Sequence, residues 1–130
     1  MIAARHGLYG VDYPASAAVY AAHQDEADGL YLAALRSQLA RGADVVLDRS
    51  FYAREDRDAF RALVAAAGAR WLLVFLRPAD KELLWRRIRA RAAGVKDPNS
   101  ALDIDRDTFD SYCRGFEDPC GEGEIIIEVT

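Results

Sequence analysis

Apolar residues recur every three or four positions in four segments of this chain, the spacing that gathers them on one face of a helix. Two of these segments are followed by a glycine, Gly42 and Gly68, the residue that most often ends a helix. Asp105 stands directly before another segment, where a helix N-cap is expected. The pattern therefore predicts four helices, over residues 16–40, 53–67, 79–93 and 106–116.

Three short apolar runs stand between or after these segments, at residues 44–48, 70–76 and 124–129. Their length and nearly unbroken apolar character are typical of strands buried on both faces of a sheet. Strands that alternate with helices favour a parallel sheet with helices on both of its faces. We therefore expect an α/β fold, with residues 1–130 forming a single domain.

The composition excludes several classes of protein. The chain has 130 residues, 52% of them hydrophobic, and a formal net charge of −4. These values are typical of one globular domain and not of a disordered chain or a basic protein that coats nucleic acid. No apolar run approaches the length of a membrane span, and no secretion signal opens the chain. With Cys113 and Cys120 interpreted as reduced thiols, we expect a soluble cytoplasmic protein.

A carboxylate ends the first apolar run, at Asp48. In open α/β sheets, ligands bind beyond the carboxyl ends of parallel strands, so a polar residue at such a tip is a candidate for binding or catalysis. The alternative is that Asp48 only caps a turn. Its position makes Asp48 the first candidate for a functional residue.

Arginines crowd the end of the third predicted helix, at Arg86, Arg87, Arg89 and Arg91. Arg87 and Arg91 are four residues apart and share a helix face. Cations grouped in this way beside a polar, glycine-bearing loop are suited to a lid that stabilises the charge of polyphosphate. The alternative is a solvated basic face that Glu82 and the carboxylates of residues 103–107 partly neutralise.

Taken in order, these segments resemble a known arrangement. Its parts are Val-Val-Leu-Asp-Arg-Ser-Phe at residues 45–51, a helix that contains Arg54-Glu-Asp-Arg57, Trp-Leu-Leu-Val-Phe-Leu at 71–76, and Leu-Trp-Arg-Arg-Ile-Arg-Ala-Arg at 84–91. Over about residues 15–130, the chain is similar to small P-loop kinases of the AAA-domain group. Zeta toxins, chloramphenicol phosphotransferases and the kinase half of polynucleotide kinases are relatives of that group. The order and spacing of the segments carry the resemblance, because no single segment is diagnostic.

The resemblance implies a P-loop NTPase-like fold that transfers a phosphoryl group from ATP, with magnesium, to a small hydroxyl acceptor. Asp48 would lie beside the magnesium ion and the phosphates as the catalytic carboxylate. Arg87 and Arg91 would bind the phosphates from the lid, and Arg5 and Tyr13 would line the acceptor side. The expected partners are therefore a nucleotide and a small molecule that the sequence does not name.

The chain departs from that family in one respect. It contains no Gly-x-x-x-x-Gly-Lys-Ser/Thr, the loop whose amides and lysine cradle the phosphates. By the resemblance, two strands and this loop would precede Met1, and the chain would be the C-terminal two-thirds of the domain, weak or inactive by itself.

The resemblance also implies a gap in the sheet, because the family's first strand would lie between residues 44–48 and 70–76. An unpaired strand edge with apolar faces is a template for association, so we expect the chain to self-associate, to bring the two strands together, or to need the missing segment. The alternative function is a kinase-like remnant without catalytic activity that binds a partner.

Overall fold

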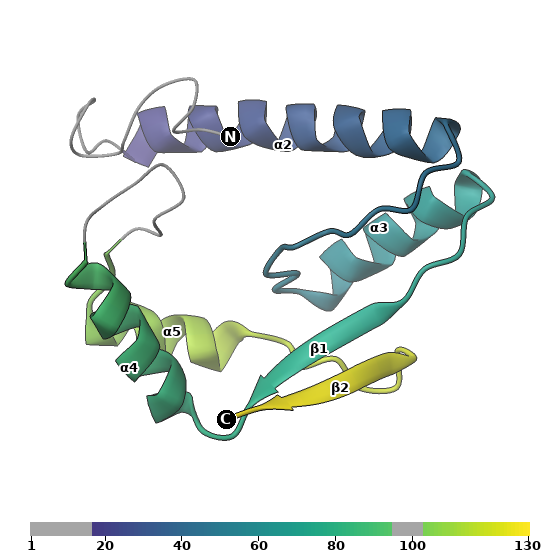
Figure 1. The fold of residues 1–130 in the computed structure, drawn as a ribbon. Helices are drawn as coiled ribbons and strands as arrows, with labels where there is room; N and C mark the ends of the chain where they lie inside the picture. Colours follow the sequence, from purple (N-terminus) through teal and green to yellow (C-terminus); the bar gives the residue numbers. More distant parts are fainter. Residues whose placement is uncertain (1–16, 95–102) are drawn as a thin grey trace. The chain divides into compact units, whose positions relative to one another are not determined.

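The structure is a computed structural model that describes residues 17–94 and 103–130 (Figure 1). The described residues fall into two compact units, the first comprising residues 17–45 with Gly94 and the second comprising residues 46–93 and 103–130. In chain order the elements are α2 (Ala17–Ala40), α3 (Arg54–Ala66), β1 (Leu73–Pro78), α4 (Lys81–Ala92), α5 (Arg106–Gly115) and β2 (Glu124–Val129).

Helix α2 makes up most of the described part of the first unit, and it confirms the predicted helix 16–40. The helix ends at Ala40, and Gly42 in the turn that follows has a φ of 69°, in the left-handed region that glycine adopts without steric cost. There the amide of Gly42 donates to the carbonyl of Leu39 at 3.0 Å, and the amide of Ala43 donates to the carbonyl of Gln38 at 3.1 Å. The glycine signal in the sequence therefore marks the observed helix end.

The helices of the second unit confirm the other three predicted helices, with ends that differ by no more than two residues. Helices α4 and α5 begin at aspartate N-caps, where Asp80 accepts a hydrogen bond from the amide of Leu83 and Asp105 accepts one from Thr108 at 2.8 Å. Each cap satisfies an amide that a helix start leaves unpaired. Hydrogen bonds from Thr108 also lower the pKa of the Asp105 carboxyl. None of the helices in the described ranges is long and apolar enough to span a membrane.

Strands β1 and β2 form a two-stranded parallel sheet, with a register that runs from Leu73 beside Glu124 to Pro78 beside Val129. Two of the three predicted strands are thus confirmed, β2 at its predicted residues and β1 shifted a few residues beyond the predicted 70–76. The connection between them passes through α4 and α5, as parallel strands require. The described architecture is α/β.

The prediction of a strand at residues 44–48 is wrong. These residues have no regular secondary structure, and Val46 is 94% exposed. An apolar run becomes a strand only when its amides and carbonyls pair with a neighbour. In the part of the chain that the structure describes, β1 and β2 pair with each other alone, and residues 44–48 pair with neither of them.

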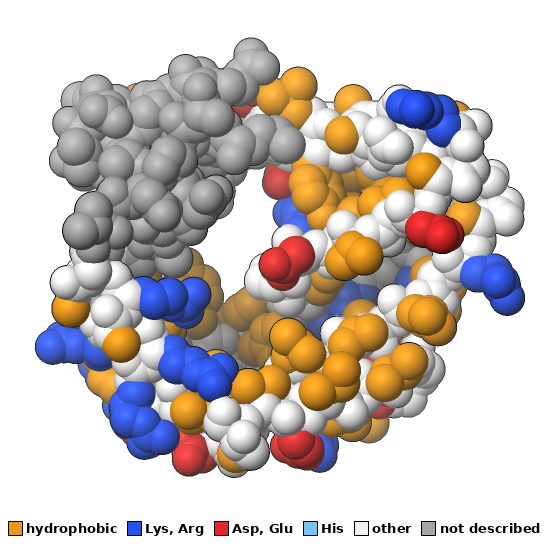
Figure 2. Space-filling view, viewed as in Figure 1, with side chains coloured by type: hydrophobic (Ala, Val, Ile, Leu, Met, Phe, Trp, Pro, Cys, Tyr) orange, Lys and Arg blue, Asp and Glu red, His pale blue; other side chains and the backbone are white. Residues whose placement is uncertain are grey.

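One face of the sheet exposes four aliphatic side chains. Alternate strand residues point to the same face, and the register therefore places Val74 and Leu76 of β1 beside Ile125 and Ile127 of β2. All four side chains are exposed. Figure 2 shows hydrophobic side chains gathered over these two strands.

The interior of the second unit combines apolar and charged side chains. Its buried apolar residues, within the described ranges, are Val64, Phe109 and Pro119. Arg57 and Glu122 are buried as well, although charged groups are rarely buried unless they are paired. An ion pair is thus a substantial part of this small interior.

Replacing Asp105 by alanine removes the side-chain acceptor for the Thr108 amide and should lower the melting temperature by several degrees. Circular dichroism during heating measures the change. Asp105→Asn is the matched control, because asparagine also caps helices and should retain most of the stability. A melting temperature that falls equally in both variants would contradict the role of the cap.

Candidate functional site

Three of the site residues predicted from the sequence, Asp48, Arg87 and Arg91, lie on two parts of the second unit. Asp48 is exposed within residues 46–53, the irregular stretch before α3 that we call the Asp48 segment. Arg87 and Arg91 are exposed on α4, where Figure 2 shows basic side chains gathered. Within residues 17–94 and 103–130, no hydrogen bond or ion pair joins Asp48 to either arginine. Arg5 and Tyr13 lie outside the described residues.

Arg87 is tied to the end of β2. Its Nη2 donates a hydrogen bond to the main-chain oxygen of Thr130 at 2.9 Å. Because Thr130 directly follows β2, this contact lies at the carboxyl end of the parallel sheet, the end at which α/β folds bind ligands.

Glu82, the residue expected to neutralise the basic face of α4, is paired with an arginine of another helix. Both oxygens of Glu82 accept hydrogen bonds from Arg106 of α5, at 2.6 and 3.1 Å, and Arg106 also donates to Asp110 at 2.9 Å. These hydrogen bonds raise the pKa of Arg106. Glu82 therefore links α4 to α5 and does not neutralise Arg87 or Arg91 in the described structure.

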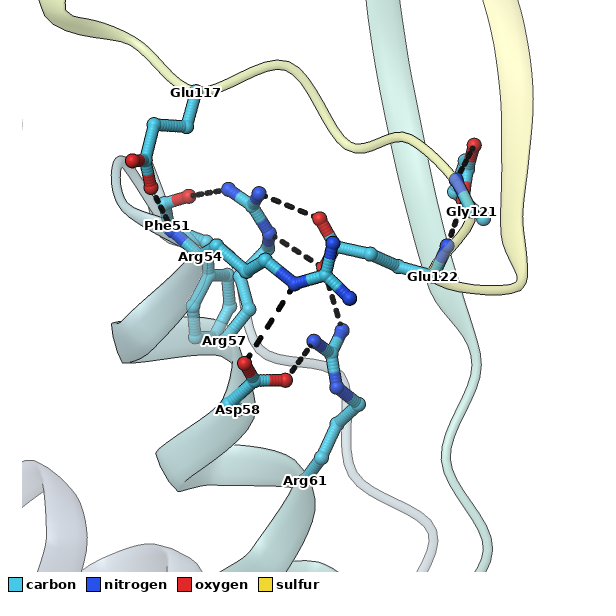
Figure 3. Close-up of polar contacts among 9 residues, drawn as sticks. Phe51, Arg54, Arg57, Asp58, Arg61, Glu117, Gly121 and Glu122 are labelled. Atoms are coloured by element: carbon cyan, nitrogen blue, oxygen red, sulfur yellow. Dashed lines mark hydrogen bonds and ion pairs between the residues drawn. The ribbon is translucent and has the colours of Figure 1, made fainter.

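A buried ion-pair cluster joins α3 to the turn before β2 (Figure 3). Arg57 donates from Nε and Nη2 to the two oxygens of Glu122, at 2.9 and 2.7 Å, in the bidentate arrangement that suits a guanidinium and a carboxylate. The two side chains are only 2% and 1% exposed. Arg61 donates to Glu122 at 2.8 Å and also pairs with Asp58. One buried carboxylate thus holds two arginines from successive turns of α3.

The cluster reaches the Asp48 segment through Phe51. The third donor group of Arg57, Nη1, donates to the carbonyl oxygen of Phe51 at 2.7 Å. Phe51 has a φ of 42°, and it is the single non-glycine residue with positive φ in the described ranges. For such a residue the left-handed region costs about 1–3 kcal/mol, so surrounding contacts must hold it there. One such contact is made by the ring of Phe60, which packs edge to face with the ring of Phe51 at a centroid distance of 5.0 Å. The guanidinium of Arg49 lies over the same Phe60 ring, 5.5 Å from its centroid.

The end of the Asp48 segment is fixed to the chain that follows α5. The amide of Glu117 donates to the carbonyl of Tyr52 at 3.1 Å, and the Glu117 carboxylate accepts a hydrogen bond from the amide of Arg54. The ring of Tyr52 packs edge to face with Phe116 at 5.9 Å. A Cβ on Gly115 would lie 1.9 Å from the Tyr52 hydroxyl, so this close approach requires glycine.

The charges of the cluster stabilise one another. Hydrogen bonds from Arg57, and then from Arg61, lower the pKa of Glu122 from 4.5 to about 2, although burial acts in the opposite direction. The same pairing raises the pKa of Arg57. The amide of Glu122 donates to the carboxylate of Glu124 at 2.8 Å, and main-chain hydrogen bonds of this kind lower the pKa of Glu124.

Sequence reasoning assigned no role to Arg57, Arg61 or Glu122. The spacing of the two arginines, one helical turn apart, was available, and so was a glutamate set between Gly121 and Gly123. Nothing local links them, because Arg57 and Glu122 are 65 positions apart. Within the described residues, no group of three His, Cys, Asp or Glu side chains is arranged to hold a metal ion.

The lowered pKa of Glu122 predicts acid sensitivity. A carboxyl group whose pKa is depressed in the folded state contributes stability above its ordinary value, and this contribution is lost as the pH falls from 4.5 through about 2. Glu122→Gln should lose that acid-dependent part and, because the buried guanidinium of Arg57 and the partly buried one of Arg61 lose their carboxylate, should cost about 3–5 kcal/mol near neutral pH. Denaturant unfolding at a series of pH values measures both effects.

Glu128→Gln is the control for this prediction, since Glu128 pairs with Arg77 on the exposed sheet and should contribute little. A Glu122→Gln variant as stable as the unchanged chain would contradict the role of the buried pair.

One of the comparisons with known proteins agrees with this architecture. A comparison with protein families matches residues 3–119 to the AAA domain, a range that includes Asp48, Arg57, Arg87 and Arg91 and ends before Glu122. Neither the curated proteins nor the solved structures gave a match. Because the matched range covers most of the chain and the described strands are parallel and linked through helices, the chain belongs to the AAA domain family, whose fold is P-loop NTPase-like.

Proposed function

We propose that this chain belongs to an ATP-dependent phosphotransferase that acts on a small hydroxyl acceptor, and that Asp48 and the arginines of α4 serve its phosphoryl transfer. The observation that carries the proposal is the setting of Asp48 in a member of the AAA domain family. Its carboxylate is exposed, while the residues that follow it, from Arg49 to Arg54, are fixed by contacts with α3 and with Glu117. A carboxylate held in this way is available to a ligand.

The chemistry of the residues fits a nucleotide with magnesium. Magnesium is typically held by one or two carboxylates together with phosphate oxygens and water, so one exposed aspartate is a sufficient protein ligand. Magnesium, when bound, neutralises charge on the β- and γ-phosphates. The Asp48 carboxylate would then accept a hydrogen bond from the acceptor hydroxyl or from a water molecule of the ion.

Arg87 and Arg91 fit the lid role through their exposure. In the described residues neither guanidinium is paired with a side-chain carboxylate. Arg91 has no hydrogen bond there, and Arg87 would exchange its hydrogen bond to the main-chain oxygen of Thr130 for one to a phosphate oxygen. A guanidinium that is free to move onto a phosphate oxygen stabilises the charge that develops during phosphoryl transfer. Arg5 and Tyr13 remain proposals for the acceptor side.

The alternative function is that of a kinase-like protein that binds a partner without catalysis. The observation in its favour is the exposed aliphatic face of the sheet, Val74 and Leu76 beside Ile125 and Ile127. Contiguous exposed apolar surface is typical of interaction sites. This alternative needs no role for Asp48.

A titration with magnesium-ATP tests the proposal. The sequence lacks the glycine-rich loop and lysine that cradle the phosphates, so we expect a Kd no tighter than about 1 mM, a binding free energy of about −4 kcal/mol. Two-dimensional NMR, which detects weak binding, should show shifts in residues 46–53 and at Arg87 and Arg91. Arg91→Ala should weaken the binding severalfold and leave the melting temperature nearly unchanged, because an exposed charge contributes little to folding.

Arg70→Ala is the control for this titration, because Arg70 is an exposed arginine near the opposite, amino end of β1. A micromolar Kd would contradict the expectation that the chain, without the phosphate-binding loop, binds magnesium-ATP weakly. The absence of any shift up to the highest nucleotide concentration would contradict the nucleotide proposal and favour the alternative.

A further inference from the structure

The guanidinium of Arg57 has one more partner than an ion pair requires. Two of its nitrogen atoms bind Glu122, and the third donates to the carbonyl of Phe51, three residues after Asp48. We infer that Arg57 is a positioning residue, which fixes the conformation in which the chain presents Asp48, and that Glu122 holds Arg57 in place for this task. The inference rests on the proposed function of Asp48.

The backbone at Phe51 is the point at which this positioning acts. With a φ of 42°, Phe51 is in a region that an aromatic residue rarely adopts. Such conformations persist where the surroundings determine them more strongly than the local preference, and they are concentrated at functional sites. If Phe51 relaxed to negative φ, the chain before it would change direction, and Asp48 would move with it.

The shape of arginine explains why this residue type is needed. A guanidinium is planar and offers donors in a fixed fork, so two of its edges can bind different partners at once. Here one edge is aligned with the Glu122 carboxylate, and the remaining donor group is thereby aimed at Phe51. A lysine at this position would retain the charge opposite Glu122 but would lose the alignment that connects the carboxylate with the loop.

Arg61 provides an internal comparison. It also binds Glu122 from α3, but its other partners are Asp58 and the ring of Trp71, and no contact of Arg61 with Phe51 is found in the described residues. Both arginines therefore contribute to the buried charge cluster. Of the two, Arg57 alone reaches the Asp48 segment.

The test compares Arg57→Lys with Arg61→Lys in the 130-residue chain by 15N relaxation and by the HN–Hα NOE of Phe51. In the unchanged chain, residues 49–53 should have order parameters of about 0.85, typical of rigid backbone, and Phe51 should show the strong NOE of positive φ. Arg57→Lys should lower the order parameters of these residues below about 0.6 and abolish that NOE. Arg61→Lys should change neither.

Sucrose keeps a destabilised variant folded during the measurement, because it is excluded from the protein surface. A folded Arg57→Lys chain with residues 49–53 as rigid as before would overturn the inference. So would a negative φ at Phe51 in the unchanged chain, or an Arg57→Lys chain that does not fold even in sucrose, since Arg57 would then have only a structural role.

The same samples separate this inference from the proposed function. If magnesium-ATP causes no shift in the unchanged chain, the nucleotide proposal fails, while the relaxation data still decide whether Arg57 fixes the segment. If magnesium-ATP binds, its affinity should fall severalfold in Arg57→Lys and remain in Arg61→Lys. Equal affinity in the two variants would show that the position of Asp48 does not depend on Arg57.

Discussion

The second unit depends on a bidentate ion pair that is almost completely removed from water, between Arg57 of α3 and Glu122 before β2. Taking two charges out of water costs several kcal/mol per ion, and only good geometry and further hydrogen bonds offset this cost. Here Arg61 and the carbonyl of Phe51 supply those hydrogen bonds. Removing one partner is costly because it leaves the other buried and unpaired, whereas an apolar pair of similar size would serve stability equally well. The charged pair contributes specificity, because the Glu122 carboxylate binds only the side of α3 that carries Arg57 and Arg61.

The ion-pair cluster of Arg57, Arg61 and Glu122 lies close to the first residues of both strands. Glu122 precedes the first residue of β2 by two positions, and the Glu124 carboxylate accepts hydrogen bonds from the amides of Gly121 and Glu122. Arg61 lies over the ring of Trp71, 5.3 Å from its centroid and two residues before β1. The same charges that hold the Asp48 segment therefore help to set the register in which β1 and β2 pair. The pair of Arg77 and Glu128, which lie beside each other on the two strands, acts on the same register.

The sequence predicted the elements whose cause is local. Helical periodicity, the Asp105 cap and the glycine after α2 depend on neighbours within a few positions, and the structure confirms them. The prediction of a strand at residues 44–48 failed because a strand exists only where its main chain pairs with a neighbouring strand. An apolar run does not show whether it will be paired in this way. Asp48 was predicted as the tip of that strand; without the strand, its role rests on the family resemblance and stays a prediction. Glu122 was missed because its partners are far away in the sequence and its own neighbourhood of glycines is typical of an ordinary turn.

The pKa of Glu122 in the folded chain tests this account most directly. The side-chain carboxyl carbon of Glu122 can be followed by NMR as the pH is lowered, together with the amide resonances of residues 49–53. The account predicts that the carbon signal remains that of a carboxylate well below 4.5 and changes only towards a pH of about 2, and that the resonances of Phe51 change with it. A carbon signal that titrates near 4.5 while the chain stays folded, with Phe51 unaffected, would contradict it.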